Sequence, residues 1–261
     1  MRHHIVESAD GSNTLMLDDY DECYHSTNGA FAEACHIYIN CGVSYLYNII
    51  KQSDIRHSSA IIIYDIGIGS ALNCITTLIW QQSLARIGMT APQIHYVGIE
   101  KYPISVDEAM QLNFPAHITE MQHLLYQTGN NIFIKEEIDR WFKLLHTSAW
   151  GQDIVIVPGF TLTKIKGDIT ECKADNFKSR IYPKAPAVIY YDTFSPSTQP
   201  KLWEKHIFEE IFNGVNYQSV LTTYCSKGTV KQAIREAGFK LERLPGPVGK
   251  RHIIRGIKLN S

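Results

Sequence analysis

The feature that most constrains the fold of this chain is a short apolar run that ends in a glycine turn. Residues Ala60–Ile66 read AIIIYDI, and Gly67 and Gly69 follow at once. A short apolar run rich in β-branched residues is typical of a strand buried on both faces. Glycines after such a strand let the backbone turn sharply into a helix and approach a ligand closely. Residues 71–86 follow with apolar side chains at helical spacing, which completes a strand–turn–helix unit.

The rest of the chain continues this alternation of strands and helices. Helical segments are predicted over roughly 103–148, 200–213 and 227–237. Because strands that alternate with helices form a parallel sheet covered on both faces, we expect a Rossmann-like doubly wound α/β fold with a mostly parallel sheet. Such folds bind ligands beyond the carboxyl ends of their strands. The further predicted strands are Gln93–Ile99, Asp153–Val157, Phe160–Ile165, Ala187–Tyr191, Ser219–Tyr224, Phe239–Leu244 and His252–Ile257.

A β-hairpin is predicted ahead of this unit. Apolar residues 5–6 and 15–17 flank Asp10-Gly11, which is a favoured tight-turn pair. Residues 29–50 look helical or mixed. The hairpin and this segment are therefore expected to form an N-terminal extension of the sheet.

Length and composition are those of an ordinary globular protein. The 261 residues are 44% hydrophobic and 20% charged. We expect one compact unit, with residues 1–50 as the extension packed on a core domain of residues 51–261. No stretch of about 18 apolar residues is present, so no membrane span is expected. Residues 1–20 lack a signal-peptide pattern, which predicts a cytoplasmic protein.

Cysteine and histidine give no sign of a metal site. The six cysteines are scattered, and none forms a C-x-x-C pair. This spacing argues against a zinc ribbon and against a thioredoxin-like redox site. The eleven histidines are scattered too, and no His/Glu spacing is typical of a metal site. We therefore expect reduced, packed thiols and no bound metal.

Charge is distributed unevenly along the chain, although the net charge is only −1. Residues 201–261 hold 11 Lys and Arg against 5 Asp and Glu. A basic C-terminal part is a possible contact surface for nucleic acid. It is equally compatible with one helix and two strands that carry solvated cations, and charge alone leaves both interpretations open.

Acidic residues flank the glycine turn and the end of the next strand. Asp65 lies two places before Gly67, a position more typical of methyltransferases than of dinucleotide-binding proteins. Leu72 stands where the dinucleotide motif G-x-G-x-x-G needs glycine or alanine. Glu100 ends the next strand, where a carboxylate accepts the ribose hydroxyls of an adenosine cofactor. The alternatives are a turn without a ligand and a surface Glu100 paired with Lys101.

Two later strand ends also carry candidate site residues. Asp168 follows Gly167 and has the chemistry to accept a hydrogen bond from an adenine amine, although alone it would be a turn residue. Asp192, Phe194 and Pro196 follow the strand Ala187–Tyr191. A carboxylate at this corner is suited to hold an amine nucleophile and to take its proton. The alternative is a strand–loop junction in which Asp192 caps a helix.

A glycine-rich turn near the C-terminus combines two glycines with three cationic side chains. It reads GPVGKRH over residues 246–252. Lys250 and Arg251 in such a turn suit contacts with phosphate groups. A solvated hairpin turn is the other interpretation.

Five segments together resemble one enzyme family. They are Tyr24–Tyr38, Asp65–Asn73 (DIGIGSALN), Gly98–Pro103 (GIEKYP), Tyr191–Trp203 and Ala237–Gly256. Their motifs resemble those of the tRNA (5-methylaminomethyl-2-thiouridine)-forming methyltransferases, which are MnmD and the methyltransferase half of the bifunctional MnmC. The resemblance runs from about residue 5 to residue 256. The chain departs from the family pattern at Asp65, usually Glu, and at Ile68, Ala71 and Thr193.

The resemblance implies a fold, a cofactor and a reaction. The fold would be that of class I S-adenosylmethionine-dependent methyltransferases, and the methyl donor S-adenosyl-L-methionine. The acceptor would be the amine of 5-aminomethyl(-2-thio)uridine at the tRNA wobble position, which Asp192 would orient and deprotonate. The donor would contact Asp65, Gly67, Gly69, Glu100, Lys101 and Asp168.

The resemblance also implies a substrate site for the anticodon stem-loop of tRNA. Phe194, Tyr24 and Trp203 would help to form a nucleobase pocket, because splayed-out RNA bases stack on aromatic side chains. Lys250 and Arg251 would contact phosphates of the stem. The remaining candidate substrate-binding residues are Asn28, Glu33 and Pro196.

The bifunctional relatives carry a flavin-dependent oxidoreductase domain, for which these 261 residues have no room. We therefore expect methylation alone. Two alternatives stay open: an N-methyltransferase of a small-molecule or protein amine, and a non-catalytic nucleotide- or RNA-binding module.

Overall fold

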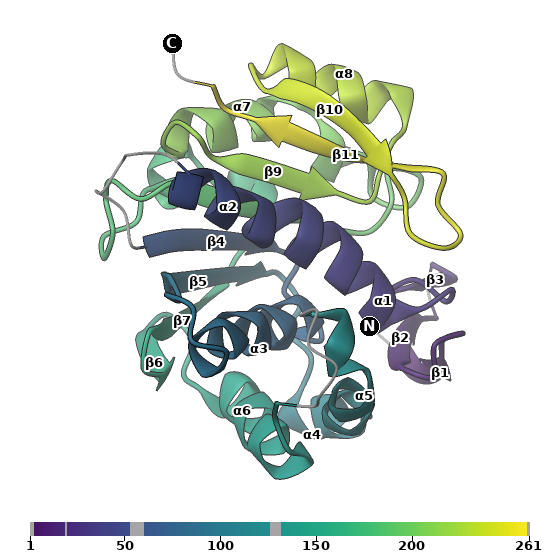
Figure 1. The fold of residues 1–261 in the computed structure, drawn as a ribbon. Coiled ribbons are helices and arrows are strands. Elements are labelled where there is room, and N and C mark those ends of the chain that lie inside the picture. The colour runs from purple at the N-terminus through teal and green to yellow at the C-terminus, as the bar shows by residue number, and fades with distance from the viewer. Residues whose placement is uncertain (1–2, 19, 53–59, 126–131, 260–261) are drawn as a thin grey trace.

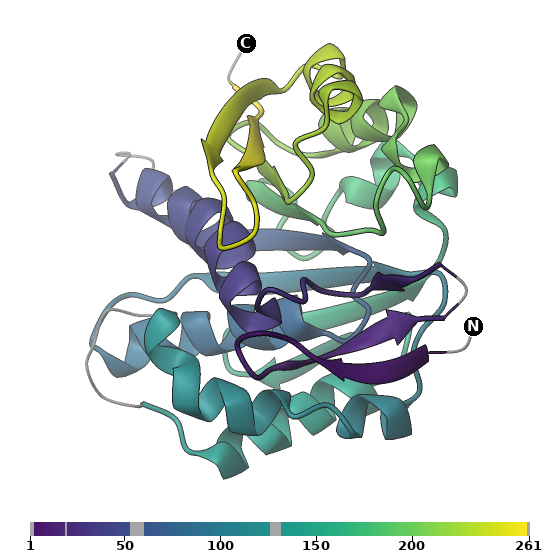
Figure 2. The same cartoon turned by 90° about the vertical axis from the view of Figure 1, so that its right-hand side faces the viewer.

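The computed structural model describes residues 3–18, 20–52, 60–125 and 132–259, and Figures 1 and 2 show its two sheets and their flanking helices. Its main sheet has eight strands in the order β10-β11-β9-β8-β4-β5-β7-β6. The strands β7, β5, β4, β8 and β9 run parallel to one another, whereas β6, β10 and β11 are antiparallel to their neighbours. The expected doubly wound, mostly parallel sheet is confirmed. The strands are β4 (Ala60–Ile66), β5 (Gln93–Glu100), β6 (Asp153–Val157), β7 (Phe160–Lys166), β8 (Ala187–Tyr191), β9 (Val220–Thr223), β10 (Lys240–Pro245) and β11 (His252–Ile257).

The central strand β4 is buried along its whole length. Its side chains alternate between the two cores of the protein: Ile61 and Ile63 join one hydrophobic cluster, and Ile62 and Tyr64 join the other. Successive side chains of a strand point to opposite faces, so an unbroken apolar run is what a sheet covered on both faces requires. The run Ala60–Ile66 therefore forms a central strand of the sheet.

Helices cover both faces of this sheet (Figure 1). One long helix crosses one face, and it consists of α1 (Ala30–Ala34), the π-helix η1 (Cys35–Val43) and α2 (Ser44–Gln52). The helix α3 (Leu72–Arg86) packs beside it, and α7 (Lys205–Gly214) and α8 (Gly228–Glu236) cover the other face. The remaining helices are α4 (Val106–Met110), α5 (Phe114–Met121), η2 (Gln122–Leu124), α6 (Lys135–Thr147), η3 (Ile169–Glu171), η4 (Ala174–Phe177) and η5 (Pro200–Trp203).

The predicted helix over 200–213 was wrong in its continuity. A short 3₁₀-helix, η5, ends at Trp203, and α7 begins only at Lys205. Glu204 between them is extended, with φ −76° and ψ 146°. A residue in that conformation breaks the helical hydrogen bonds, so apolar spacing alone overestimated the length of the helix.

The N-terminal hairpin is present, and a third strand extends it. The strands β1 (His3–Glu7), β2 (Asn13–Leu17) and β3 (Glu22–Cys23) form a separate antiparallel sheet. Figure 2 shows it beside the start of the long helix. The loop between β1 and β2 spans five residues, because Glu7 pairs with Asn13, so Asp10-Gly11 is not a two-residue hairpin loop. A four-residue turn does end at Gly11, whose N–H donates to the carbonyl of Ser8 at 2.9 Å.

Asp10 in this loop has a structural reason for its place. Its carboxylate accepts the backbone N–H groups of Ser12 and Ala32, each at 3.1 Å. The second bond satisfies a free N–H in the first turn of α1, where a negative charge is favoured. Asp10 therefore fastens the N-terminal sheet to the long helix.

The strand order places a ligand site at one edge of the sheet. From β4 the chain continues to β5 and β7 on one side, whereas β8 and β9 lie on the other side. Between β4 and β8 the direction of winding reverses, and doubly wound sheets bind ligands at such a switch point, beyond the carboxyl ends of the strands. No helix among the described residues is long and apolar enough to cross a membrane.

Close packing around Gly214, at the end of α7, predicts that a larger residue there lowers the stability of the protein. A Cβ on Gly214 would lie 2.2 Å from the carbonyl oxygen of Ala174, which is backbone and unable to move aside cheaply. We expect Gly214→Ala to lower the free energy of unfolding by about 1–3 kcal/mol. Gly228→Ala is the matched control, because nothing lies within 4 Å of its Cβ position. Urea unfolding of both variants measures the difference, and equal midpoints would contradict the prediction.

Candidate functional site

Two neighbouring cavities lie at this edge of the sheet. The larger cavity, of about 530 Å³, is lined by the residues that follow β4, β5, β7 and β8, together with Tyr20 and Tyr24. The smaller cavity, of about 330 Å³, is lined by residues 21–27 and by Glu33, Tyr224 and Lys250. The wall common to both cavities contains Tyr24, Asp192, Thr193 and Phe194.

The glycine turn after β4 borders the larger cavity, and its geometry requires glycine. Gly67 has φ 89° and Gly69 has φ 47°, both in the left-handed region. A Cβ on Gly67 would lie 2.9 Å from the carbonyl oxygen of Asp192, and one on Gly69 would lie 2.9 Å from the ring of Tyr24. The absence of side chains therefore lets the turn pack directly against two other parts of the site.

Glu100 reaches back from the end of β5 to this turn. Its carboxylate accepts the N–H of Gly69 at 3.1 Å and the N–H of Tyr102 at 2.9 Å. Lys101 does not pair with it but donates to Asp168 at 2.6 Å, so the alternative of a Glu100–Lys101 pair was wrong. Each oxygen of a carboxylate has two lone pairs, so Glu100 retains acceptor capacity toward the larger cavity.

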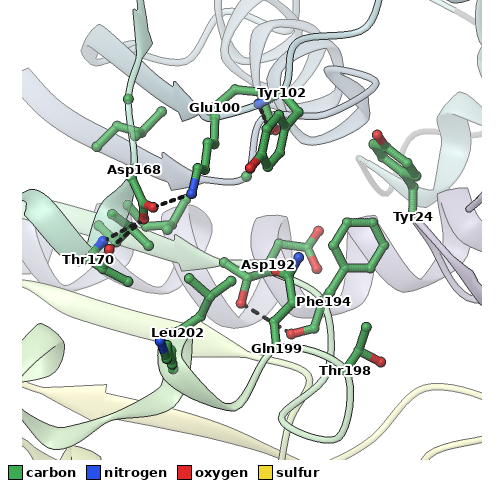
Figure 3. Close-up of a pocket in the computed structure, with 18 of the residues that line it drawn as sticks. Tyr24, Glu100, Tyr102, Asp168, Thr170, Asp192, Phe194, Thr198, Gln199 and Leu202 are labelled. Carbon is green, nitrogen blue, oxygen red and sulfur yellow. Dashed lines mark hydrogen bonds and ion pairs between the residues drawn. The ribbon is translucent and has the colours of Figure 1, made fainter. Parts of the chain in front are cut away.

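Asp168 lines the larger cavity, and Figure 3 shows it beside Thr170. Burial acts to raise the pKa of its carboxyl, but hydrogen bonds from Lys101 and Thr170 bring that pKa below the usual value. One carboxylate oxygen accepts the backbone N–H of Thr170 at 2.9 Å. Asp168 is therefore an ionised hydrogen-bond acceptor on the cavity wall.

Asp65 does not line either cavity. Its side chain is fully buried behind the glycine turn, where the Tyr96 hydroxyl donates to it at 2.6 Å. Burial raises the pKa of this carboxyl well above its ordinary value. A direct contact of Asp65 with a cofactor stays a prediction. In the structure its buried side chain lies beneath the glycine turn.

Asp192 lies on the common wall of the two cavities. Its carboxylate accepts a hydrogen bond from the Asn73 amide at 2.8 Å, rather than capping a helix. Burial raises the pKa of Asp192, while the Tyr38 hydroxyl, the Asn73 amide and the Lys250 ammonium act in the opposite direction. A carboxylate on a cavity wall whose pKa is raised is a typical general base.

Aromatic rings complete the common wall. Phe194 meets Tyr24 edge to face, with ring centroids 5.3 Å apart, and Figure 3 shows both side chains beside Asp192. Trp203 was predicted to help form this pocket, but it lines neither cavity. It is buried behind the loop, where its indole N–H donates to the carbonyl of Phe194 at 2.8 Å.

Lys250 enters the smaller cavity. Its ammonium forms an ion pair with Glu33 and lies 5.3 Å from the centre of the Tyr224 ring. Burial raises the pKa of the Glu33 carboxyl, and Lys250 opposes this shift. Lys250 is therefore half-buried and paired, whereas Arg251 is exposed, and a contact of either with phosphate stays a prediction.

Two other candidate residues lie outside both linings. Asn28 packs against the C-terminal turn, since a Cβ on Gly249 would lie 2.3 Å from its amide nitrogen. Pro196 belongs to the loop after β8 but lines neither cavity. Sequence reasoning missed Glu22, Asn73 and Tyr224. Only Asn73 carried a signal, as the last residue of DIGIGSALN.

Metal chemistry finds no support in these side chains. Over residues 3–18, 20–52, 60–125 and 132–259, no group of three or more His, Cys, Asp or Glu is arranged to hold a metal ion. The site instead combines carboxylate acceptors in the larger cavity with several carboxylates and the Lys250 ammonium in the smaller one.

Comparisons with known proteins show what this chain is similar to. Residues 152–259 match the family model of an S-adenosyl-L-methionine-dependent methyltransferase. The chain is 27% identical over 256 residues to the tRNA 5-methylaminomethyl-2-thiouridine biosynthesis bifunctional protein MnmC of Burkholderia mallei (strain NCTC 10229). It is 28% identical over 258 residues to MnmC of Burkholderia pseudomallei (strain 668). Each match covers 97% of this chain and 35% of the relative, so the chain spans about a third of its length.

A solved structure shares the fold. The crystal structure of MNMC2 from Aquifex aeolicus has a TM-score of 0.68 and 21% sequence identity, over 99% of this chain and 72% of that chain. The resemblance found in the sequence is thus confirmed, as are the methyltransferase fold and S-adenosyl-L-methionine as the cofactor.

Proposed function

We infer that this chain is an S-adenosyl-L-methionine-dependent methyltransferase that methylates the primary amine of 5-aminomethyl(-2-thio)uridine at the tRNA wobble position. The product is 5-methylaminomethyl(-2-thio)uridine. The observation that carries the proposal is the position of Asp192, a half-buried carboxylate on the wall between two cavities. One cavity suits the methyl donor and the other suits an amine. A tRNA substrate would make this a cytoplasmic reaction.

The larger cavity has the features of a donor site. Its volume of about 530 Å³ falls within the usual range for cofactor pockets. Gly67 lies on its wall, and Glu100 and Asp168 are acceptors for ribose hydroxyls and an adenine amine. When bound, the donor supplies an electrophilic methyl group on its sulfonium. The chain's own task is to align the acceptor with that group.

The smaller cavity suits a cationic amine. Carboxylates of Asp21, Glu22, Glu33 and Asp192 line it. An aliphatic amine has a pKa near that of lysine, about 10, so it arrives protonated at pH 7 and has no free lone pair. Asp192 would accept its proton, and the rings of Tyr24 and Phe194 would contact the attached base.

The acceptor is tested by methyl transfer from labelled S-adenosyl-L-methionine to tRNA that lacks the terminal methyl group. We expect label in 5-methylaminomethyl-uridine, identified by nucleoside mass spectrometry. Thermal shifts with S-adenosyl-L-methionine and with NAD check the donor separately. Donor binding without any label in tRNA would overturn the acceptor and redirect the search to small-molecule amines.

Arg251 is proposed to contact a phosphate of the anticodon stem-loop. It is exposed next to the smaller cavity, whereas Lys250 is paired inside it. We expect Arg251→Ala to reduce the slope of log K against log salt for tRNA binding by about 0.7–0.9, the release of one counterion. Lys231→Ala, on α8, is the control for loss of one basic charge. Titration at several salt concentrations measures the slope, and an unchanged slope would contradict the contact.

A further inference from the structure

The loop after β8, residues 192–199, is held by side chains from several elements. The Tyr224 hydroxyl donates to the carbonyl of Thr193 at 2.8 Å, and the Trp203 indole donates to the carbonyl of Phe194 at 2.8 Å. Asn73 holds Asp192 from α3. Three neutral donors, a hydroxyl, an indole and an amide, therefore hold the loop that carries the candidate base.

The carboxylate of Glu22 also binds this loop. Glu22 of β3 accepts the backbone N–H of Ser195 at 2.8 Å and the Ser195 hydroxyl at 3.2 Å. It also accepts the hydroxyl of Thr198. Hydrogen bonds to an ionised acceptor are about twice as strong as bonds between neutral groups. One carboxylate of the N-terminal sheet therefore accepts three hydrogen bonds from the loop after β8. Glu22 and Ser195 are 173 residues apart in the chain.

The residues that follow Glu22 contact the donor side of the site. Tyr24 packs edge to face on Phe194 and leaves no room for a Cβ at Gly69. The imidazole of His25 forms a hydrogen bond of 2.6 Å with the hydroxyl of Ser70. The segment 22–25 thus touches both the loop after β8 and the glycine turn.

We propose that Glu22 is a positioning residue, which fixes the loop 192–199 so that Asp192 and Phe194 stay between the two cavities. The inference rests on the proposed function, since positioning matters because Asp192 serves the acceptor. Glu22 lines the smaller cavity, but both of its carboxylate oxygens accept hydrogen bonds from this loop. It acts through Ser195 and Thr198, and a misplacement of about 1 Å in a catalytic group costs up to 10²-fold in rate.

Hydrogen exchange tests the inference without an acceptor. In Glu22→Ala the amide of Ser195 loses its acceptor, so we expect it to exchange about tenfold faster, while amides of α8 keep their rate. Glu7→Ala is the matched control, because Glu7 is an exposed carboxylate of the same sheet, on β1. Unchanged exchange at Ser195 in a folded Glu22→Ala protein would overturn the proposal.

Steady-state kinetics provide the second readout. We expect Glu22→Ala to lower kcat about tenfold, with the dissociation constant of S-adenosyl-L-methionine within about twofold of the original. Glu22→Gln keeps one oxygen to accept the Ser195 N–H and should recover most of the rate. Equal losses in the Gln and Ala variants, or a loss confined to donor binding, would contradict positioning.

The two proposals fail in distinguishable ways. If the unmodified protein does not methylate tRNA but Glu22→Ala loosens Ser195, the acceptor is wrong and the positioning role stands. If tRNA is methylated and Glu22→Ala changes neither exchange nor kcat, the positioning role is wrong. Thr198→Val removes a second donor with little change in volume and should give a smaller loss of the same kind.

Discussion

Replacing Asp192 with asparagine is expected to lower kcat for methyl transfer by about 10²–10⁴-fold, the usual contribution of a general base. Asparagine keeps the size of the side chain and a partner for the Asn73 amide, which donates to Asp192 at 2.8 Å. It has no basic oxygen to accept the proton of an ammonium group. The loss should therefore fall on the chemical step and not on the binding of the donor.

Single-turnover kinetics with labelled donor measure this effect, and calorimetry measures donor binding in parallel. Asp175→Asn is the control, because that carboxylate is 87% exposed and paired only with Lys178 on the surface. A kcat within tenfold of the original in Asp192→Asn would show that Asp192 at most orients the amine.

The pH dependence follows from the same residue. Burial raises the pKa of Asp192, and the charged or ionisable groups around it are Asp65, Glu33, Lys250, Tyr38 and Tyr224. A base works only when ionised, so kcat should fall as pH decreases through a pKa above the ordinary 3.8. This acidic limb should disappear in Asp192→Asn.

The contribution of Asp192 to stability changes with pH in the direction opposite to kcat. A carboxyl whose pKa is raised by folding stabilises the protein below its ordinary pKa, and this contribution is lost as pH rises through the folded value. At neutral pH the ionised form of Asp192, whose pKa is raised in the folded protein, therefore costs stability. Asp192→Asn should unfold at a higher temperature than the original protein at pH 7, and a lower unfolding temperature would contradict this account.

Replacing Glu100 with alanine is expected to weaken the binding of S-adenosyl-L-methionine by about 10–150-fold. One hydrogen bond to a charged acceptor contributes roughly 1.5–3 kcal/mol, and each 1.4 kcal/mol is a factor of ten. Glu100 also accepts the N–H groups of Gly69 and Tyr102, so its removal frees two donors at the glycine turn. Both effects act on the larger cavity.

Calorimetric titration with the donor measures the change in Glu100→Ala. Glu171→Ala is the control, because Glu171 is an exposed glutamate of η3 that lines neither cavity. The single-turnover rate at saturating donor should change far less than in Asp192→Asn. Donor binding within twofold of the original would mean that Glu100 only braces the turn.

The sequence by itself determined the sheet and the places where ligands meet it. Ala60–Tyr64 is apolar at every position, on both faces of a strand, so it had to lie between two layers of helices. The glycines after it, and Glu100 and Asp192 at later strand ends, came to one edge because parallel strands share the direction of their carboxyl ends. These features depend on residues close together in the chain.

Only the tertiary structure decided which side chains meet across the site. Lys250 pairs with Glu33, 217 residues away, and Glu22 reaches Ser195 across 173 residues. Trp203 lies behind the loop and Asp65 behind the turn, although both stand in motifs that suggested ligand contact. Periodicity fixes which face of an element is buried, but it carries no information on how far a side chain lies from a cavity. That distance is set by the packing of elements that are distant in sequence, through contacts that form only when the chain has folded.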